Sequence, residues 1–375
     1  MSELAKTNRR DFRWELLTTA SALALITHVS STAANAETTD RPTVWLELGG
    51  QLETVQGRED IYAAPFILRN LDMPVNAVSP TTAQHPPLHA FDGEGKLLFE
   101  PTDSDWVFSA AVRFGRSNGK KTLHQQTHTS FSAKSAKYSS PLGLHRIFHF
   151  TPSRANHSET KNSETHVIAD FVAGRDVGLG LVGKGGSSIL NFGVRMAQFT
   201  RHADVIFRSQ PDNYFLAKAV GKSSFATNRH HHSYYAHAWS GRSFHGIGPS
   251  LSWEGSAPFA GHPDAAELTF DWGANAAVLF GRQRVQGGHM TTGHYFRGLA
   301  TTHYTHTVPP IERSRSVVVP NVGGMAGISV KYPNAKFSLG YRADFFFNAM
   351  DQGLDTRDTK TQGFFGPYVN FAVGL

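Results

Sequence analysis

The chain of 375 residues contains no cysteine, and no apolar run after residue 36 is long enough to cross a membrane as a helix. Without cysteine the fold has no disulfide to hold it together. A transmembrane helix needs about 20 consecutive apolar residues, so a helical membrane protein is excluded. No acid–histidine pairing stands out beside a nucleophile among the many serines and histidines. The sequence therefore predicts no enzyme.

The charges show no strong excess of either sign. The chain has 36 Lys and Arg residues against 30 Asp and Glu residues, a formal net charge of +6 with histidine neutral. This excess is spread along the chain, whereas a nucleic-acid-binding surface concentrates basic residues in one patch. We therefore expect no nucleic-acid partner.

Residues 1–36 are typical of an export signal peptide. A basic segment ends at Arg13, an apolar core covers residues 16–26, and Ala34-Asn35-Ala36 fits the rule for signal cleavage. Arg9-Arg10-Asp11-Phe12 also resembles a twin-arginine signal, so two export routes remain open. The twin-arginine route suits folded cargo and ranks second here. The remaining residues, 37–375, form the predicted structural domain.

Residues 316–350 show the clearest structural pattern, two arms of alternating side chains around Pro333-Asn334. In the second arm, apolar residues from Phe337 to Phe347 alternate with small or charged residues such as Gly340 and Arg342. Successive side chains of a strand point to opposite faces, and Pro-Asn suits a tight turn. An apolar outer face with aromatic residues near the strand ends, opposite a polar inner face, is typical of an outer-membrane barrel.

The same alternation recurs along the domain and predicts an all-β fold, a transmembrane antiparallel up-and-down β-barrel. Strands are expected at residues 43–55, 93–100, 106–114, 167–173, 190–196, 244–254, 268–280, 318–332, 337–347 and 365–375. This pattern gives about ten strands. Eight or twelve remain possible, because residues 205–209 form a short run that is not assigned to any of these strands. Long extracellular loops are expected at residues 57–89, 117–164, 201–241 and 284–315, and short periplasmic turns at residues 183–186, 257–265 and 333–335.

Charges of both signs lie on the faces that should line the lumen. They are Glu47, Glu53, Arg113, Asp170, Arg195, Glu254, Glu267, Asp271, Arg342 and Asp344. An eight-stranded barrel is just filled by its side chains, and ten strands are close to that limit. We therefore expect these charges to pair across a mainly filled lumen. A narrow conducting path is the alternative.

The chain also contains 20 histidines, many of them in the predicted loops. Two groups stand out, namely His230, His231, His232 and His237, and then His289, His294, His303 and His306. Imidazole suits zinc, copper and nickel. The spacings are loose, however, and no acidic ligand is interleaved with them. We therefore predict no metal site and no cofactor.

Several strand segments together resemble a known family. These are Val44-Trp45-Leu46-Glu47-Leu48-Gly49-Gly50-Gln51, the segment FDWGANAAVLFGRQ at residues 270–283, the hairpin at residues 319–344 and the closing residues 363–375. They are similar to segments of the pore-forming outer-membrane proteins related to the Legionella major outer-membrane protein. The resemblance implies an outer-membrane barrel that forms pores. This chain departs from the pattern in lacking cysteine and in ending on Leu375, where barrels commonly end on an aromatic residue.

The predicted function is that of an outer-membrane β-barrel, either a narrow porin-like pore or a structural surface protein. The alternative is a surface binding or adhesion protein whose barrel only anchors the histidine-rich loops. The expected partners are outer-membrane lipid, the barrel-assembly machinery through the C-terminal strand, and small solutes or ions. The expected location is the bacterial outer membrane.

Overall fold

The computed structural model describes residues 43–57, 88–101, 104–128, 136–140, 143–147, 153–178, 186–209, 214–220, 224–262, 265–297, 300–353 and 357–375. The predicted signal peptide at residues 1–36 lies outside these residues. So do most of the predicted loop at residues 57–89 and most of the predicted turn at residues 183–186.

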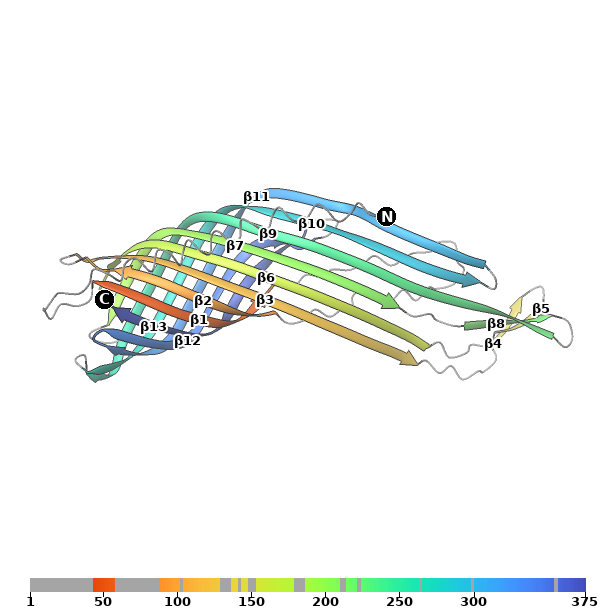
Figure 1. Cartoon of the computed structure of the whole chain (residues 1–375), viewed down its shortest axis with the longest axis horizontal. Helices are drawn as coiled ribbons and strands as arrows, with labels where there is room; N and C mark the ends of the chain where they lie inside the picture. The colour runs from red at the N-terminus through yellow and green to blue at the C-terminus, as the bar shows by residue number, and fades with distance from the viewer. Residues whose placement is uncertain are drawn as a thin grey trace.

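Ten strands form one antiparallel sheet that closes on itself. They are β1 (Val44–Gln56), β2 (Leu88–Phe99), β3 (Trp106–His128), β6 (Ser153–Asp176), β7 (Ser187–Ser209), β9 (Ser224–His262), β10 (Ala266–Arg297), β11 (Ala300–Tyr332), β12 (Ala335–Asp351) and β13 (Thr359–Gly374). Neighbours in this order pair with each other, and β1 pairs with β13 to close the ring. The prediction of a ten-stranded up-and-down barrel is confirmed (Figure 1).

Short connections join the strands at one end of the barrel, called the turn end here. The turn at Pro333-Asn334 joins β11 to β12 as predicted, and the C-terminus lies at the same end (Figure 1). The predicted connection at residues 257–265 is wrong in most of its length, because β9 continues through Pro258 to His262. A register shift at Leu268/Thr269 accompanies this proline, and such bulges tolerate a residue without an N–H group.

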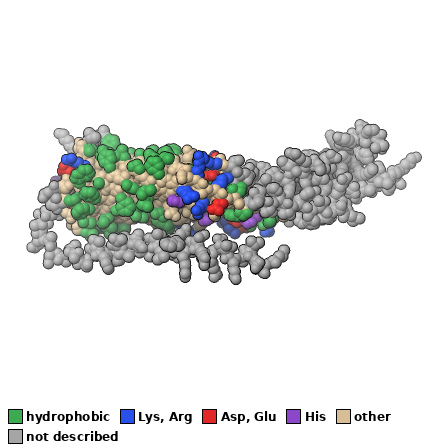
Figure 2. All heavy atoms as spheres, turned by 90° about the horizontal axis from the view of Figure 1, so that it is seen from above, with side chains coloured by type: hydrophobic (Ala, Val, Ile, Leu, Met, Phe, Trp, Pro, Cys, Tyr) green, Lys and Arg blue, Asp and Glu red, His purple; other side chains and the backbone are tan. Residues whose placement is uncertain are grey.

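An apolar belt surrounds the barrel next to the turn end. Alternate residues of every strand point outward, and many of them are large exposed apolar side chains, for example Phe108, Phe192, Leu251, Phe280 and Phe371. Figure 2 shows this belt, bounded on one side by charged and histidine side chains. A strand segment such as residues 268–280, tilted by about 40°, spans about 30 Å, the thickness of a bilayer core. The barrel is therefore of the transmembrane type.

The strands continue past the belt, at what we call the extended end. On the outer face of β10, Phe280 is followed by Arg282, Arg284 and Gln286. The predicted loops at residues 117–164, 201–241 and 284–315 are therefore wrong in most of their length, because these polar residues lie in β3, β6, β7, β9, β10 and β11 (Figure 1). The outer face stops alternating with apolar residues where it meets water. The ladder of backbone hydrogen bonds does not depend on apolar side chains, so the strands continue. The unplaced residues 205–209 are the end of β7.

Three short strands complete the described chain. β8 (Tyr214–Val220) pairs with the start of β9, and β4 (Ala136–Ser140) pairs with β5 (Gly143–Ile147) in a separate hairpin. Figure 1 shows all three beyond the extended end of the barrel. No helix in the described part of the chain is long and apolar enough to cross a membrane.

The belt can be tested by charge substitution at two outward positions of β10. Ala276→Arg places a guanidinium within the belt and should lower the free energy of unfolding in lipid vesicles by about 2–4 kcal/mol. The matched control Gln286→Arg adds the same side chain beyond the belt and should change it little. Urea unfolding of both variants in lipid vesicles measures the difference, and equal losses would contradict the position of the belt.

Candidate functional site in the barrel lumen

Side chains from opposite walls of the barrel meet in the lumen. Phe199 lies on β7 and Phe364 on β13, which are on opposite sides of the ring of ten strands. Their ring centroids are only 5.3 Å apart. Phe346 on β12 and Phe244 on β9 also contact Phe199, with centroid distances of 4.7 Å and 5.7 Å. All four rings are buried, so they fill the cross-section at this level.

We call this level the phenylalanine layer. Further buried apolar side chains surround the four rings, including Val55, Ile168, Leu279, Val319 and Met350. On the side of the phenylalanine layer that faces the extended end, Arg201 of β7 donates a hydrogen bond of 3.1 Å to Gln362 of β13. This contact again joins one wall to the other. A barrel of this size leaves little interior space once large side chains point inward.

A layer of paired charges, which we call the charge layer, lies on the turn-end side of the phenylalanine layer. The Arg195 guanidinium donates two hydrogen bonds to Asp170, of 2.7 Å and 3.0 Å, and another to Asn321. Arg113 pairs with Asp344 at 2.7 Å, and Arg342 pairs with Glu94 at 2.5 Å. Closer to the turn end, Lys96 pairs with Glu254 and Lys336 with Asp271. Each cation faces a carboxylate on another strand, so the charges are compensated inside the lumen.

The structure brings most of the predicted lumen charges together. The residues in these pairs are Arg113, Asp170, Arg195, Glu254, Asp271, Arg342 and Asp344. Glu47 accepts a hydrogen bond from the Asn370 side chain. Glu267 has the same inward parity near the start of β10 but makes no ion pair with a described residue. Glu53 belongs to a different cluster, described below.

A cavity opens on the turn-end side of the charge layer. It has a volume of about 310 Å³ and is lined by charged side chains that include Glu47, Lys96, Glu254 and Lys336. The cavity ends at the charge layer, since Arg113, Arg195, Arg342 and Asp344 also line it. The described lumen is therefore open on one side and filled by side chains farther along.

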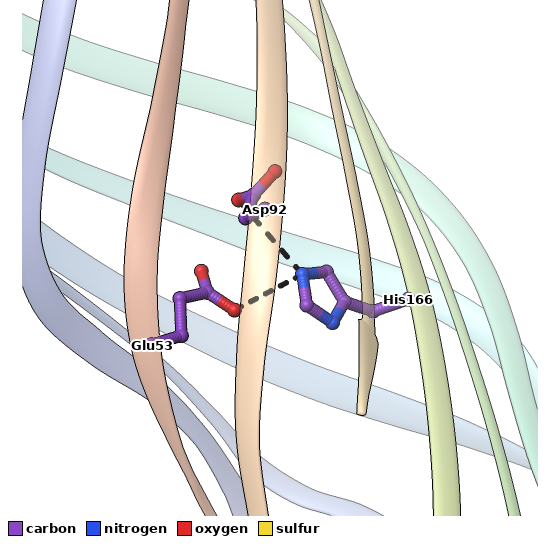
Figure 3. A group of neighbouring side chains, drawn as sticks. All are labelled: Glu53, Asp92 and His166. Carbon is purple, nitrogen blue, oxygen red and sulfur yellow. Dashed lines mark ion pairs between the residues drawn. The ribbon is translucent and has the colours of Figure 1, made fainter. Parts of the chain in front are cut away.

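Glu53, Asp92 and His166 form a separate buried cluster (Figure 3). The His166 Nε2 atom lies 3.2 Å from Glu53 Oε2 and 3.8 Å from Asp92 Oδ2. Its other ring nitrogen, Nδ1, lies 3.3 Å from both carboxylate oxygens of Glu164. The His166 ring also packs against Phe364, with a centroid distance of 4.1 Å. The cluster therefore lies beside the phenylalanine layer.

A glycine allows His166 to reach this cluster. His166 lies on β6 opposite Gly115 of β3, whereas Asp92 and Glu53 lie on the next two strands of the ring, β2 and β1. A Cβ atom at position 115 would lie 2.2 Å from the His166 ring. The imidazole therefore crosses over β3 only because residue 115 has no side chain.

Sequence reasoning missed three charged residues of β2, Asp92, Glu94 and Lys96. The predicted strand begins at Gly93, one residue too late to include Asp92, and none of its charged residues is among the predicted lumen charges. Its alternation with Phe91, Leu97 and Phe99 was the available signal. His166 has the same inward parity as Asp170, but only the ladder pairings bring it near β1 and β2.

The chain resembles known proteins only distantly. No family model and no curated protein sequence matches it. Among solved structures it is similar to the translocator domain of the autotransporter NalP from Neisseria meningitidis, at 9% identity over 96% of this chain and 98% of that chain, with a TM-score of 0.26. It is also similar to the β domain of a Bordetella autotransporter, at 9% identity over 90% of this chain and 100% of that chain, with a TM-score of 0.21. The toluene transporter TodX of P. putida matches at 9% identity over 90% of this chain and 91% of that chain, with a TM-score of 0.17.

These TM-scores carry no argument about function. The assignment of the fold depends on the strand ladders and on the apolar belt described above. The resemblance to the Legionella family stays a prediction.

The histidine groups lie in strands instead of loops. His230, His231, His232 and His237 belong to β9, His289 and His294 to β10, and His303 and His306 to β11. His237 pairs with Asp204 of β7 at 2.9 Å.

The segment Gly115-Arg116-Ser117-Asn118-Gly119 matches the motif of many serine hydrolases, but it lies within β3 and not at a strand-to-helix turn. The Ser117 hydroxyl is buried without a hydrogen-bond partner among the described residues.

The charge layer predicts a non-additive pair of substitutions. Arg195→Leu leaves Asp170 and Asp344 partly uncompensated inside the barrel and should cost about 3–5 kcal/mol. Arg195→Leu combined with Asp170→Leu should recover part of this loss, because a buried pair can be replaced by apolar residues at little cost. Urea unfolding in lipid vesicles measures both variants, with Arg282→Leu on the exposed face as the control. Additive losses would contradict the pairing of Arg195 with Asp170.

Proposed function

We propose that this protein is a bacterial outer-membrane barrel that anchors a surface binding structure, the alternative anticipated from the sequence. The contact between Phe199 and Phe364 carries this proposal, since it joins opposite walls and fills the lumen. A lumen filled at one level by buried rings and at the next by paired charges is blocked at both levels by side chains of the described residues. The barrel then acts as an anchor, and function resides in the strands that extend from it.

The lengths of the strands support this division. A transmembrane strand needs about 9–11 residues, whereas β9 has 39, β10 has 32 and β11 has 33. At about 3.3 Å per residue, β9 alone is about 130 Å long, so most of it lies outside a bilayer. The outer face of these extensions is polar close to the belt, as expected for a segment surrounded by water.

Export and assembly fit the same proposal. Residues 1–36 would direct the chain out of the cytoplasm, and the outer-membrane lipid would then contact the belt. The C-terminal strand β13 closes the barrel against β1 and is the segment that the assembly machinery would bind. Neither step requires a cofactor or a nucleic-acid partner.

A pore is the second candidate function, and the turn-end cavity is the observation that favours it. The cavity is charged, and a displacement of both the charge layer and the phenylalanine layer would connect it to the extended end. Rings of charge then select which ions pass. The predicted resemblance to a pore-forming family supports the same candidate.

Planar-bilayer recordings separate the two candidates. The wild-type protein should show no discrete conductance steps. Phe199→Ala, Phe364→Ala and Arg195→Ala together remove two rings that meet across the lumen and the guanidinium at the centre of the charge layer, and this triple variant should conduct. The matched control combines Phe337→Ala with Phe371→Ala, two neighbouring residues of the lipid-facing surface, and should stay silent. Conductance steps from the folded wild-type protein would favour the pore and contradict the anchor.

The role of the extension can be tested by shortening one hairpin. Gln286 of β10 and Glu312 of β11 are opposite each other in the ladder, so Asn-Gly can replace residues 287–311 and rejoin the strands. The shortened protein should still form a barrel with heat-modifiable mobility on a gel, whereas cells that carry it should lose adhesion to surfaces and to one another. Cells without the protein give the background. Adhesion equal to that of the full-length protein would contradict a role for this hairpin.

A further inference from the structure

We propose that Glu53, Asp92 and His166 bind a first-row divalent metal ion inside the barrel, with Zn²⁺ and Mn²⁺ as the ions that fit the donor set. The three side chains come from β1, β2 and β6 and converge on one point beside the phenylalanine layer (Figure 3). This inference is independent of whether the barrel anchors a binding structure or forms a pore.

The polar atoms of the cluster are buried and lack hydrogen-bond partners. Both carboxylate oxygens of Glu53, both of Asp92 and the Nε2 atom of His166 have no hydrogen bond with any described residue. The side chains of Glu53, Asp92 and His166 are at most 1% exposed. Buried carboxylates that accept no hydrogen bond are unfavourable, and a bound cation satisfies several of these oxygens at once.

The acidic character of the cluster suits a divalent cation. Glu53 and Asp92 bring two negative charges, and their ion pairs among the described residues are with His166 alone. The nearby Arg113 pairs with Asp344 instead. Glu164 adds a third carboxylate beside the His166 ring, so the cluster is acidic, and a divalent ion offsets the charge of the two carboxylates that would bind it.

The ligand distances suit a metal ion with little rearrangement. The ligand atoms lie within 4.8 Å of one another, with His166 Nε2 at 3.2 Å from Glu53 and at 3.8 Å from Asp92. Two ligands at about 2.1 Å from a zinc ion are about 3.0–3.4 Å apart at the usual coordination angles. One imidazole with two carboxylates suits zinc or manganese, whereas calcium and magnesium prefer oxygen ligands alone.

Two neighbouring residues have the roles expected around a metal site. Glu164 lies beside Nδ1 of His166 and fixes the tautomer that points Nε2 at the other two ligands. Across the ladder, Arg201 of β7 lies opposite Glu164. Gly115 provides the space in which the imidazole crosses β3. Glu164 and Gly115 are therefore positioning residues of the proposed site.

Metal retention by the full chain tests the proposal. The protein is refolded in detergent, loaded with Zn²⁺ or Mn²⁺, dialysed against metal-free buffer and analysed for metal per chain. The wild type should retain about one ion more than Asp92→Asn or His166→Ala, because each substitution removes a ligand. Glu164→Gln should weaken affinity about 10–100-fold, and Gly115→Ala should also weaken it by displacing the ring.

Two controls account for zinc held elsewhere on this histidine-rich chain. His237→Ala removes a partly exposed histidine beside a carboxylate, and Asp170→Asn removes a lumen carboxylate on the same strand as His166. Neither should change the tightly held ion. Asp92→Asn preserves side-chain volume, and its heat-modifiable mobility confirms that it folds. Equal metal retention by the wild type and by folded Asp92→Asn would overturn the proposal, as would a wild type that retains no metal.

Discussion

Closure of the sheet is the constraint on which the rest of this structure depends. Inside a bilayer every backbone N–H and C=O group needs a partner from the protein, and only a closed sheet provides one for each strand. Here the pairing of β1 with β13 closes the ring. With ten strands the ring is narrow, so inward side chains from opposite walls meet. The contact of Phe199 with Phe364 and the hydrogen bond of Arg201 with Gln362 follow directly from this size.

The layers of the lumen depend on one another. The phenylalanine layer excludes water from one side of the charge layer, and ionic interactions are stronger where water is excluded. Charges there must be paired, because an isolated buried charge is strongly unfavourable. Arg113, Arg195 and Arg342 each meet a carboxylate from a strand that is not their neighbour in the ring. Such pairs connect distant strands and so stabilise the closed form.

Alternation in the sequence was sufficient to predict the belt and the inner face. In β3, Trp106, Phe108 and Phe114 share the outward parity and Arg113 has the inward one, because a strand has a period of two residues. The strand ends were not predictable in this way. Beyond Phe280 both faces of β10 are polar in places, so the periodic signal disappears although the ladder of hydrogen bonds continues.

Contacts across the lumen also could not be predicted from the sequence. Parity places Glu53 and His166 on the inward face, but it gives neither their relative height nor the strands between them. Both depend on the register of β1 with β2, of β2 with β3 and of β3 with β6. A shift of one residue in any of these ladders would reverse the faces. The cluster of Glu53, Asp92 and His166 can therefore be identified only when the register of these strands is known.

The cluster of Glu53, Asp92 and His166 lies at the level where the barrel passes into its extension. On the outer face of β6 the residues that flank His166 are Val167, towards the belt, and Thr165, towards the extended end. His166 therefore lies where the barrel leaves the apolar belt. Beyond this level the strands lose the support of the bilayer, while inside the barrel the phenylalanine layer ends. An ion shared by β1, β2 and β6 at this height would connect strands that the ladder joins only through β3, and it would brace the base of the extension where the other constraints weaken.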